Sequence, residues 1–461
     1  MTSYHDTIVA ISTPSGSGAL GVIRLSGLEA IAIAEAVFSR DLSKAKGHTL
    51  HYGNIVKEAT VLDEAVAAVF RAPRSYTRED VVEFSCHGSP YILREVLLLL
   101  VEQGARLAEP GEFTRRAYLN GALDLAQAEA VADLIASTSA GAHQIAMNQL
   151  RGGVSRELKD LREQLLNFTS LIELELDFGE EDVEFADRTQ LAALVVRIRL
   201  RLEGLISSFR LGNAIKQGVP TVIVGKPNAG KSTLLNALLN DNRAIVSDIP
   251  GTTRDVIEDR LHIGGIEFRL MDTAGLRHTS DLIEAEGVNR SLELAQKAQI
   301  LIYVFDALLE TPQEAQEAVQ ALDLPEGVEV ALVGNKFDQI ADPEVYVSDH
   351  DLPGLRYAWL GISAKTGWHL SGLRNWMTDT VRDLGSDTPG QVIISHARHI
   401  QALQKALTAL HEVEEGLQNG LTGDLLAIDI RTVLYYIGEI TGEISNDEVL
   451  GNIFSKFCIG K

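Results

Sequence analysis

The sequence has very little cysteine and no long apolar run. Its 461 residues include only two cysteines, Cys86 and Cys458, too few for a disulfide framework, so a reducing cytoplasm is the expected compartment. The N-terminus, MTSYHDTIVAIS, lacks the basic and apolar regions of a signal peptide. No stretch reaches the roughly 18 apolar residues that a membrane span needs. These absences predict a soluble protein that is not exported.

Basic residues are also scarce, with 41 Lys and Arg against 64 Asp and Glu, a net charge of −23. This balance argues against binding nucleic acid by general neutralisation of phosphates. The excess is uneven, because residues 1–120 carry 12 basic and 14 acidic side chains (−2), whereas residues 217–385 carry 14 and 25 (−11). The first segment is therefore not shielded by a strong negative field.

The apolar content of 45% is enough to fill several cores. At about 100–200 residues per domain, the length predicts two to four domains. Residues 1–120 mix short β-branched runs with helical stretches, which predicts an N-terminal α/β domain. From residue 124 to residue 209 the apolar positions follow a helical period. In the first domain we expect strands at 7–11, 21–25, 66–70 and 81–85 and helices at 27–38 and 89–102.

A second α/β pattern begins near residue 217, and strands alternating with helical stretches there predict a doubly wound, mostly parallel sheet. Its strands are expected at 221–225, 268–271, 300–305 and 328–333, and helices return at 397–417 and 425–441 after a linker at 386–395. The predicted fold class is multidomain α/β plus all-α. The expected parts are an α/β domain (1–120), a discontinuous helical domain (121–216 and 386–461) and a domain inserted at 217–385. Four sequential units are the alternative.

The strongest motif, Gly225-Lys-Pro-Asn-Ala-Gly-Lys-Ser232, fits G-x-x-x-x-G-K-[ST] between an expected strand and an expected helix at 233–239. Glycines let such a loop wrap phosphates with backbone N–H groups at a helix N-terminus. Lys231 would reach the β- and γ-phosphates, and Ser232 would bind Mg²⁺. The alternative is a glycine loop with a chance lysine. Phosphate contacts are expected from Asn228, Ala229, Gly230, Lys231, Ser232 and Thr233.

Three further motifs follow in the order that a GTPase needs. Asp272-Thr-Ala-Gly275 suits a carboxylate that holds Mg²⁺ through water and an N–H on the γ-phosphate. Asn335-Lys-Phe-Asp338 would place a carboxylate against the N1–H and 2-amino groups of guanine, a donor pair that adenine lacks. Ser363-Ala-Lys365 would close the base pocket. The motifs predict a guanine nucleotide site that includes Asp272, Thr273, Ala274, Gly275, Asn335, Lys336, Asp338, Ser363, Ala364 and Lys365.

A polar loop, Ile249 to Asp255, lies between the first two motifs. One of its threonines should bind Mg²⁺ when the γ-phosphate is present, and we expect Thr253. Such loops become ordered on the triphosphate, so the module is predicted to be a switch as well as a hydrolase. Leu276 stands where well-known small GTPases carry a glutamine that orients the attacking water. Glu284 is a candidate for activating this water, and the alternative is a solvated helix carboxylate.

Other short segments carry a resemblance to a known family: F-C-I-G-K at 457–461, L-D-L-A-Q-A-E-A at 123–130, E-P-G-E-F-T at 109–114 and G-T-T-R-D at 251–255. Together with the GTPase motifs they resemble the MnmE (TrmE) family of tRNA modification GTPases over essentially the whole chain. The resemblance implies a homodimer that acts with the flavoprotein MnmG (GidA), in a heterotetramer or larger complex. The two would add an aminomethyl or carboxymethylaminomethyl group to C5 of the wobble uridine of certain tRNAs.

The resemblance also implies cofactors. The N-terminal domain would dimerise the protein and bind a 5-formyl-tetrahydrofolate-type one-carbon carrier through Arg24, Glu83 and Lys461. At Ala122 the family has a lysine, so at best the backbone of Ala122 serves. A potassium ion bound beside the β- and γ-phosphates would stimulate hydrolysis. Glu284 matches the catalytic glutamate of the family. The implied K⁺ ligands are Asn228, Ser247, Ile249 and Thr252, and these loop residues are also expected to contact GTP.

The two cysteines differ in what the sequence suggests for them. A Cys458 thiolate could add to C6 of the uridine and activate C5. Alternatively, the tail merely closes the folate site, with Cys458 packed as a small apolar residue. In a strand, the side chains of Cys86 and His87 would point to opposite faces, so Cys86 is expected in the core.

Two other interpretations of the chain stay open: a ribosome-assembly or regulatory RNA-binding GTPase without modification chemistry, and a stand-alone folate-dependent transferase. Under the family interpretation, the net charge of −23 predicts that most phosphate contacts to tRNA come from the flavoprotein. The affinity of this chain for tRNA should then be weak and strongly salt-dependent.

Overall fold

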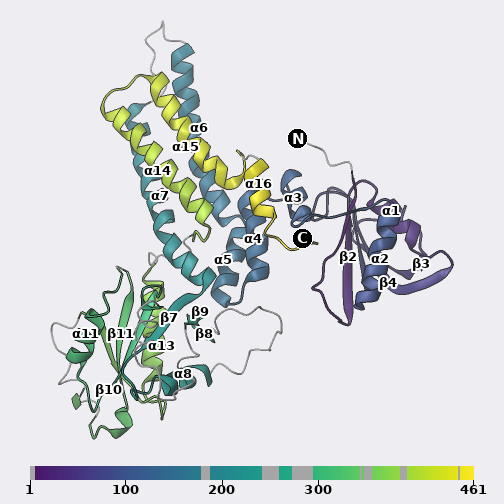
Figure 1. Cartoon of the computed structure of the whole chain (residues 1–461). Helices are drawn as coiled ribbons and strands as arrows, with labels where there is room; N and C mark the ends of the chain where they lie inside the picture. The colour runs from purple at the N-terminus through teal and green to yellow at the C-terminus, as the bar shows by residue number, and fades with distance from the viewer. Residues whose placement is uncertain are drawn as a thin grey trace. The chain divides into compact units, whose positions relative to one another are not determined.

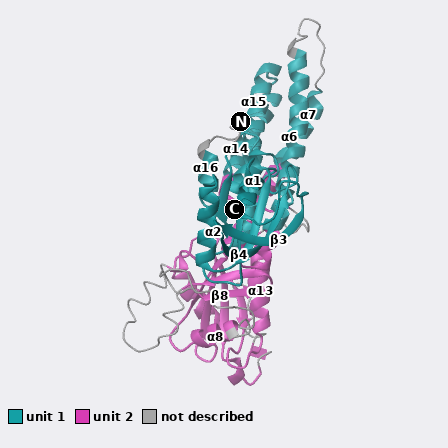
Figure 2. Ribbon diagram, turned by 90° about the vertical axis from the view of Figure 1, so that its right-hand side faces the viewer, with its two compact units in different colours: residues 1–136, 146–199, 401–461 teal, residues 137–145, 200–400 magenta. Residues whose placement is uncertain are grey.

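A computed structural model describes residues 6–177, 187–240, 259–271, 294–325, 327–342, 345–346, 356–384, 392–444 and 447–460. Figure 2 shows the chain as two compact units. One comprises residues 1–136, 146–199 and 401–461, and the other comprises residues 137–145 and 200–400. Each unit is built from separate stretches of the chain. The limits of the inserted domain at 217 and 385 stay a prediction.

The first unit begins with a six-stranded sheet in the order β3-β4-β5-β2-β1-β6 (Figure 1). Its strands pair antiparallel except β1 with β6. Alternate residues point inward, and Ile23, Leu25, Phe84 and Cys86 share a core with α1 and α2. The elements are β1 (Ile8–Ile11), β2 (Leu20–Ser26), α1 (Ala30–Val37), β3 (Thr49–Lys57), β4 (Thr60–Phe70), β5 (Val81–His87), α2 (Pro90–Glu102) and β6 (Arg106–Leu107).

Helices make up the rest of the first unit, and the long helix α15 packs along α6 (Figure 1). The buried residues of α15 recur every three to four positions, as in Leu426, Ile430, Val433 and Ile437, so one stripe faces the bundle. Gly442 caps the C-terminal end of this helix, and its φ of 81° is a conformation that favours glycine. The helices are α3 (Glu112–Leu119), α4 (Leu125–Ala136), α6 (Gly153–Asp177), α15 (Gly423–Thr441) and α16 (Asp447–Phe454). Helices α5 (Ala140–Leu150), α7 (Arg188–Gln217) and α14 (Ala397–Gln418) have residues in both units.

The second unit has a sheet in the order β12-β11-β10-β7-β9-β8, parallel except for the pair of β8 with β9. Both faces of this sheet are covered. Ile223 of β7 packs in a core with residues of α8 and α13, whereas Val222 and Val224 pack in a second core with residues of α11. The elements are β7 (Val219–Val224), α8 (Lys231–Asn240), β8 (Asp259–Ile263), β9 (Ile266–Leu270), β10 (Ile300–Asp306), α11 (Pro312–Gln320), β11 (Glu329–Asn335), β12 (Ala358–Gly361) and α13 (Leu370–Arg382).

The predicted fold class, multidomain α/β plus all-α with a doubly wound and mostly parallel sheet, is confirmed. Each strand and helix expected above overlaps an observed one. The four strands at the edges of the two sheets, β3, β6, β8 and β12, were not predicted. Among the described helices, none has the length and apolarity that crossing a bilayer requires.

Candidate functional site

The phosphate loop, residues 225–232, connects β7 to α8 as the sequence predicts. Gly225 and Gly230 have φ of 147° and 95°. A Cβ on Gly225 would lie 1.9 Å from the carbonyl oxygen of Val304, and a Cβ on Gly230 would lie 2.1 Å from Nδ2 of Asn335. Only glycine therefore lets the loop pass this close to its neighbours. The exposed Asn228 also has a positive φ, of 61°.

Lys231 is the first residue of α8 and is half-buried. Its Nζ donates hydrogen bonds to the carbonyl oxygens of Gly225 and Lys226, each at 2.8 Å, so the side chain folds back over the loop. Burial lowers the pKa of this ammonium group. A polyphosphate would supply the negative charge that favours the ammonium form. Ser232 and Thr233 follow in the first turn of α8, and the N-terminus of a helix favours negative charge. The loop therefore suits an anion.

Asn335, the last residue of β11, connects the phosphate loop to the segment that carries Ser363. Its Nδ2 donates to the carbonyl oxygen of Ala229 at 2.9 Å, and its Oδ1 accepts the N–H of Ala364 at 2.9 Å. The residue is 3% exposed. Both polar ends of one buried side chain are thus used to hold two loops together.

The base loop, residues 335–339, includes the single-turn helix η1 (Phe337–Gln339). Ser363 Oγ donates to Asp338 Oδ1 at 2.7 Å and accepts the N–H of Thr366 at 3.2 Å. Asp338 and Lys365 are exposed. The Asp338 carboxylate is therefore oriented by Ser363 while it stays accessible to a ligand with adjacent N–H donors.

Aromatic packing and an ion pair fix the base loop. Phe337 is buried and stacks on Trp368, with ring centroids 5.6 Å apart and planes 11° from parallel. Lys336 has φ of 71°, and its Nζ donates to Asp306 Oδ2 at 2.6 Å. Asp306 and Trp368 lie outside the motifs that predict the site. A carboxylate directly after the apolar strand at 300–305 was the available signal for Asp306.

The structure thus brings together the described part of the predicted nucleotide site: Asn228, Ala229, Gly230, Lys231, Ser232, Thr233, Asn335, Lys336, Asp338, Ser363, Ala364 and Lys365. The other predicted residues, Ser247, Ile249, Thr252, Thr253, Asp272, Thr273, Ala274, Gly275, Glu284 and Lys461, lie outside the described residues. Within the described ranges, His, Cys, Asp and Glu side chains form no group of three that could hold a metal ion.

Arg24 and Glu83 face each other on the paired strands β2 and β5, and Arg24 Nε donates to Glu83 Oε1 at 2.7 Å. The guanidinium lies over the rings of Tyr76 and Phe113, with its Cζ 5.5 Å and 5.6 Å from their centroids. This set of donor, acceptor and aromatic faces suits a flat heteroaromatic ring. Ala122 follows α3, and its N–H donates to the Ala117 carbonyl at 2.8 Å, so only its carbonyl offers a further backbone contact.

The C-terminal tail, residues 457–460, returns to the N-terminal sheet. The carbonyl oxygen of Cys458 accepts the N–H of Gly111 at 3.4 Å, and that of Gly460 accepts Ser12 Oγ at 3.1 Å. Gly460 has φ of 96°, and a Cβ there would lie 2.4 Å from the Ile11 carbonyl oxygen. Cys458 is exposed, whereas Phe457 is buried against α4. The tail motif therefore contacts the motif at 109–114.

Glu112, in that motif, has no exposed surface. Arg106 Nη2 and Arg116 Nη2 donate to its Oε1 at 2.6 and 3.1 Å, and the N–H of Glu109 donates to its Oε2 at 2.8 Å. Burial alone would raise the pKa of Glu112, but these donors outweigh burial and lower it. The buried carboxylate therefore stays ionised and ties the start of α3 to β6.

Cys86 lies in the core as predicted, at 1% exposure, while the side chain of His87 is exposed. Burial, and secondarily the charge of Asp63, raise the pKa of the Cys86 thiol to about 12. Asp63 Oδ1 is 2.7 Å from His87 Nδ1. The Cys86 thiol is therefore neutral and buried, whereas Cys458 is exposed.

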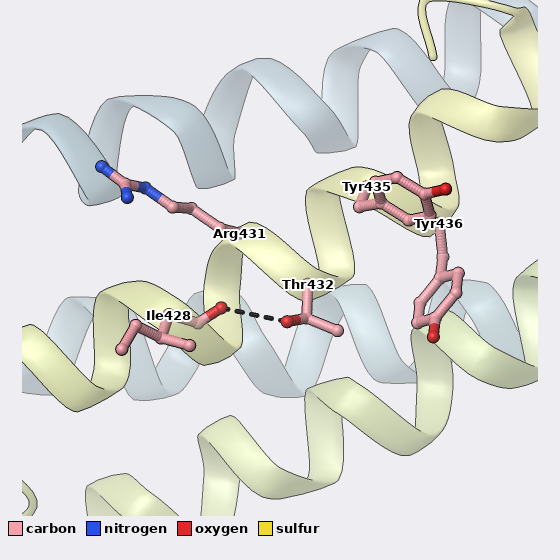
Figure 3. A pocket seen from close by; sticks show the side chains of 5 residues that line it. All are labelled: Ile428, Arg431, Thr432, Tyr435 and Tyr436. Carbon is pink, nitrogen blue, oxygen red and sulfur yellow. Dashed lines mark hydrogen bonds between the residues drawn. The ribbon is translucent and has the colours of Figure 1, made fainter. Parts of the chain in front are cut away.

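A shallow surface pocket of about 360 Å³ lies on α15 (Figure 3). Thr432 Oγ1 there donates to the Ile428 carbonyl at 3.1 Å, and Arg431 pairs with Glu173. Its lining residues are Ile428, Arg431, Thr432, Tyr435 and Tyr436. None of the residues predicted from the sequence lines this pocket.

Comparison with known proteins gives matches along the chain. Residues 7–122 match the family model described as the GTP-binding protein TrmE N-terminus, and residues 125–458 match the model of the MnmE helical domain. A solved GTP-binding protein of Sulfolobus solfataricus in complex with GDP matches at 19% identity over 49% of this chain and 68% of that chain, with a TM-score of 0.27. That similarity is too low to bear on function.

Curated relatives match over their full length. A tRNA modification GTPase MnmE of Flavobacterium psychrophilum is 50% identical over 99% of this chain and 100% of its own. A protein of the same name from Flavobacterium johnsoniae is 51% identical over 99% of both chains. Two family models and identity at this level over whole chains agree with the resemblance inferred from the motifs. The chain belongs to the MnmE (TrmE) family.

Proposed function

We propose that this chain is a potassium-stimulated GTPase that acts with a flavin-dependent partner of the MnmG type to modify C5 of the wobble uridine of tRNA. Its relatives named tRNA modification GTPase MnmE support the GTPase and the tRNA substrate. The observation that carries the proposal within this chain is the double hydrogen bond of Asn335. It joins a phosphate loop to a loop beside Asp338, and a guanine nucleotide needs both loops at once.

Magnesium would be held by Ser232 and Thr253, and potassium by Asn228, Ser247, Ile249 and Thr252. Of these residues, Ser232 and Asn228 lie among the described ones, at the start of α8 and in the exposed part of the phosphate loop. Potassium would neutralise charge on the β- and γ-phosphates, the role that an arginine plays in other GTPases. Replacing K⁺ by Na⁺ should slow turnover. Equal rates in the two salts would refute the potassium site.

The folate-type one-carbon carrier would bind the N-terminal domain at Arg24 and Glu83, with Lys461 and the backbone of Ala122 as further contacts. The Arg24–Glu83 pair beside two aromatic rings supports this assignment, as does the position of the tail against Gly111 and Ser12. The carrier would supply a carbon at the oxidation level of formate. Cys458 is exposed and held through its backbone, so its thiol is available for a nucleophilic role.

The partners and compartment complete the proposal. The protein would be a homodimer through its N-terminal domain, would combine with the flavoprotein in a heterotetramer or larger complex, and would work in the cytoplasm on tRNA. The domain limits would be 1–120, 121–216 with 386–461, and 217–385. With 25 acidic against 14 basic residues in 217–385, this chain should contribute few of the phosphate contacts to tRNA.

Reconstitution tests the proposal. Purified chain, GTP, the folate carrier, the flavoprotein and unmodified tRNA should together yield a 5-substituted wobble uridine. The chain without the flavoprotein should yield none, and product in that sample would favour a stand-alone transferase. Removal of residues 457–461 should abolish product while GTP hydrolysis persists. If wobble uridines stayed fully modified without the tail, an RNA-binding GTPase without modification chemistry would be the better account.

A further inference from the structure

Two carboxylates flank the turn that follows β10, and each is paired with a lysine from a different loop of the nucleotide site. At the start of the turn, Asp306 Oδ2 accepts a hydrogen bond from Lys336 Nζ of the base loop at 2.6 Å. At its end, Glu310 Oε1 lies 3.1 Å from Lys226 Nζ of the phosphate loop. The turn therefore contacts both loops, which are more than one hundred residues apart in sequence.

In each of these pairs the carboxylate is buried. Glu310 is 5% exposed and Asp306 9% exposed. Tyr303 OH donates a second hydrogen bond to Glu310 Oε1 at 3.3 Å, and Asp306 Oδ1 accepts the N–H of Leu308 at 3.1 Å. A buried carboxylate that loses its cation is left uncompensated, so such pairs matter more than pairs between exposed side chains.

The turn itself is fixed at both ends. Asp306 ends a fully buried strand, and its carbonyl oxygen accepts the N–H groups of Leu309 and Glu310 at 2.9 and 3.0 Å. Thr311 then caps α11, with the N–H of Thr311 donating to Glu314 Oε2 at 2.8 Å in a capping box. A turn held between a central strand and a capped helix is a rigid support for the two lysines.

We infer that Asp306 and Glu310 are positioning residues of the nucleotide site. Glu310 holds the phosphate loop through Lys226, and Asp306 holds the base loop through Lys336. The inference rests on the proposed nucleotide site. It adds a second connection between the two loops, independent of Asn335, that spans the site from the β10 side. Neither carboxylate is required to touch the nucleotide.

A double-mutant cycle on the full-length chain tests this inference. Binding of a fluorescent GDP with Mg²⁺ would be measured for Glu310→Gln, Lys226→Gln and the double variant, with Glu317→Gln on the exposed face of α11 as the matched control. Glu310→Gln should weaken binding roughly tenfold. The double variant should be no weaker than the single ones, since both remove the same pair. Additive losses, or a Glu310→Gln variant that binds like Glu317→Gln, would overturn the inference.

The roles of Glu310 and Asp306 can be distinguished by comparing the binding of two nucleotides that differ in their base. Loss of Glu310 loosens the phosphate loop, so it should weaken GDP and inosine diphosphate equally. Asp306→Asn should weaken the binding of GDP more than that of inosine diphosphate. Inosine diphosphate lacks the 2-amino group whose hydrogen bond Asp338 would accept. Equal losses for both nucleotides in Asp306→Asn would refute the role of Asp306 in the base loop.

Two controls separate this inference from its premise. Lys231→Ala should abolish tight binding if the nucleotide site is correct. Tight nucleotide binding by Lys231→Ala would refute the nucleotide site. If Lys231→Ala loses binding while Glu310→Gln binds like the wild-type chain, only the positioning role of Glu310 is refuted. Thermal unfolding of each variant, compared with Glu317→Gln, shows whether a change in affinity comes from loss of the fold. A Glu310→Gln variant that melts earlier but binds normally would also contradict the inference.

Discussion

Asn335 donates a hydrogen bond of 2.9 Å from its side-chain Nδ2 to the carbonyl oxygen of Ala229 in the phosphate loop. Its Oδ1 accepts the N–H of Ala364 at the same distance, so one buried amide sets the spacing of the two loops. A side chain of this kind contributes to binding through geometry, because the loops on which it acts would carry the nucleotide contacts.

Substitution of Asn335 should therefore impair nucleotide binding. Asn335→Ala leaves the Ala229 carbonyl and the Ala364 N–H without the hydrogen bonds that Asn335 provides. Each buried polar group left unsatisfied lowers the free energy of unfolding by about 1–3 kcal/mol. We expect GDP affinity to fall about tenfold or more and the second unit to unfold at lower temperature. Asn375→Ala, on the exposed surface of α13, is the control. Fluorescence titration with unchanged affinity in Asn335→Ala would show that the loops keep their places without this bridge.

Base selectivity should follow Asp338. In Asp338→Asn the side chain gains a donor and loses one acceptor, so preference should move from guanine toward xanthine, which has a carbonyl in place of the 2-amino group. Ser363 Oγ, 2.7 Å from Asp338 Oδ1, can keep its hydrogen bond to the amide oxygen. Competition between GDP and xanthosine diphosphate measures the shift. An unchanged preference would place the base elsewhere, and Asp379→Asn on α13 serves as the control.

Catalysis should depend on Glu284. Because this carboxylate is expected to act on water and not on ground-state contacts, Glu284→Ala should abolish hydrolysis while GTP affinity stays nearly unchanged. General base catalysis accounts for about 10²–10⁴ in rate, so the fall should be at least 100-fold. Glu286→Ala, two positions along, is the comparison. A large loss of GTP affinity in Glu284→Ala would instead assign the residue a structural role.

The two thiols should react very differently. Burial raises the pKa of Cys86 from 9.0 to about 12, so its reactive thiolate is absent from the folded protein at pH 8. Iodoacetamide should label one thiol per folded chain, Cys458, and two after denaturation. Labelling of the folded Cys458→Ser variant would contradict the burial of Cys86. The folded state favours the protonated thiol of Cys86 over the thiolate. Its contribution to the free energy of unfolding is therefore complete below pH 9.0 and is lost as the pH rises toward 12.

Much of the fold was predictable, because buried strands such as β10 and helices such as α15 carry strong periodic patterns. The edge strand β3 was missed for a physical reason. Leu50 and Tyr52 are 74% and 60% exposed, so these two apolar residues do not mark a buried face as Ile55 of the same strand does. Loop motifs predict a nucleotide site, and the described residues of these motifs lie at one edge of the sheet because they follow neighbouring parallel strands.

Contacts between distant side chains could not be predicted in the same way. The pairs of Glu310 with Lys226 and of Asp306 with Lys336 depend on how far the turn after β10 reaches, which no local pattern encodes. The tail contact of Gly460 with Ser12 joins residues 448 positions apart. Ser12 belongs to none of the motifs, so no signal in the sequence predicts this contact.

The most direct test of the account is a nucleoside analysis of bulk tRNA from a strain that lacks this chain. The account predicts that the C5 substituent of the wobble uridine disappears and that the wild-type chain restores it. Lys231→Ala should fail to restore it, since the modification is expected to need GTP hydrolysis. Fully modified wobble uridines in the deletion strain would contradict the account.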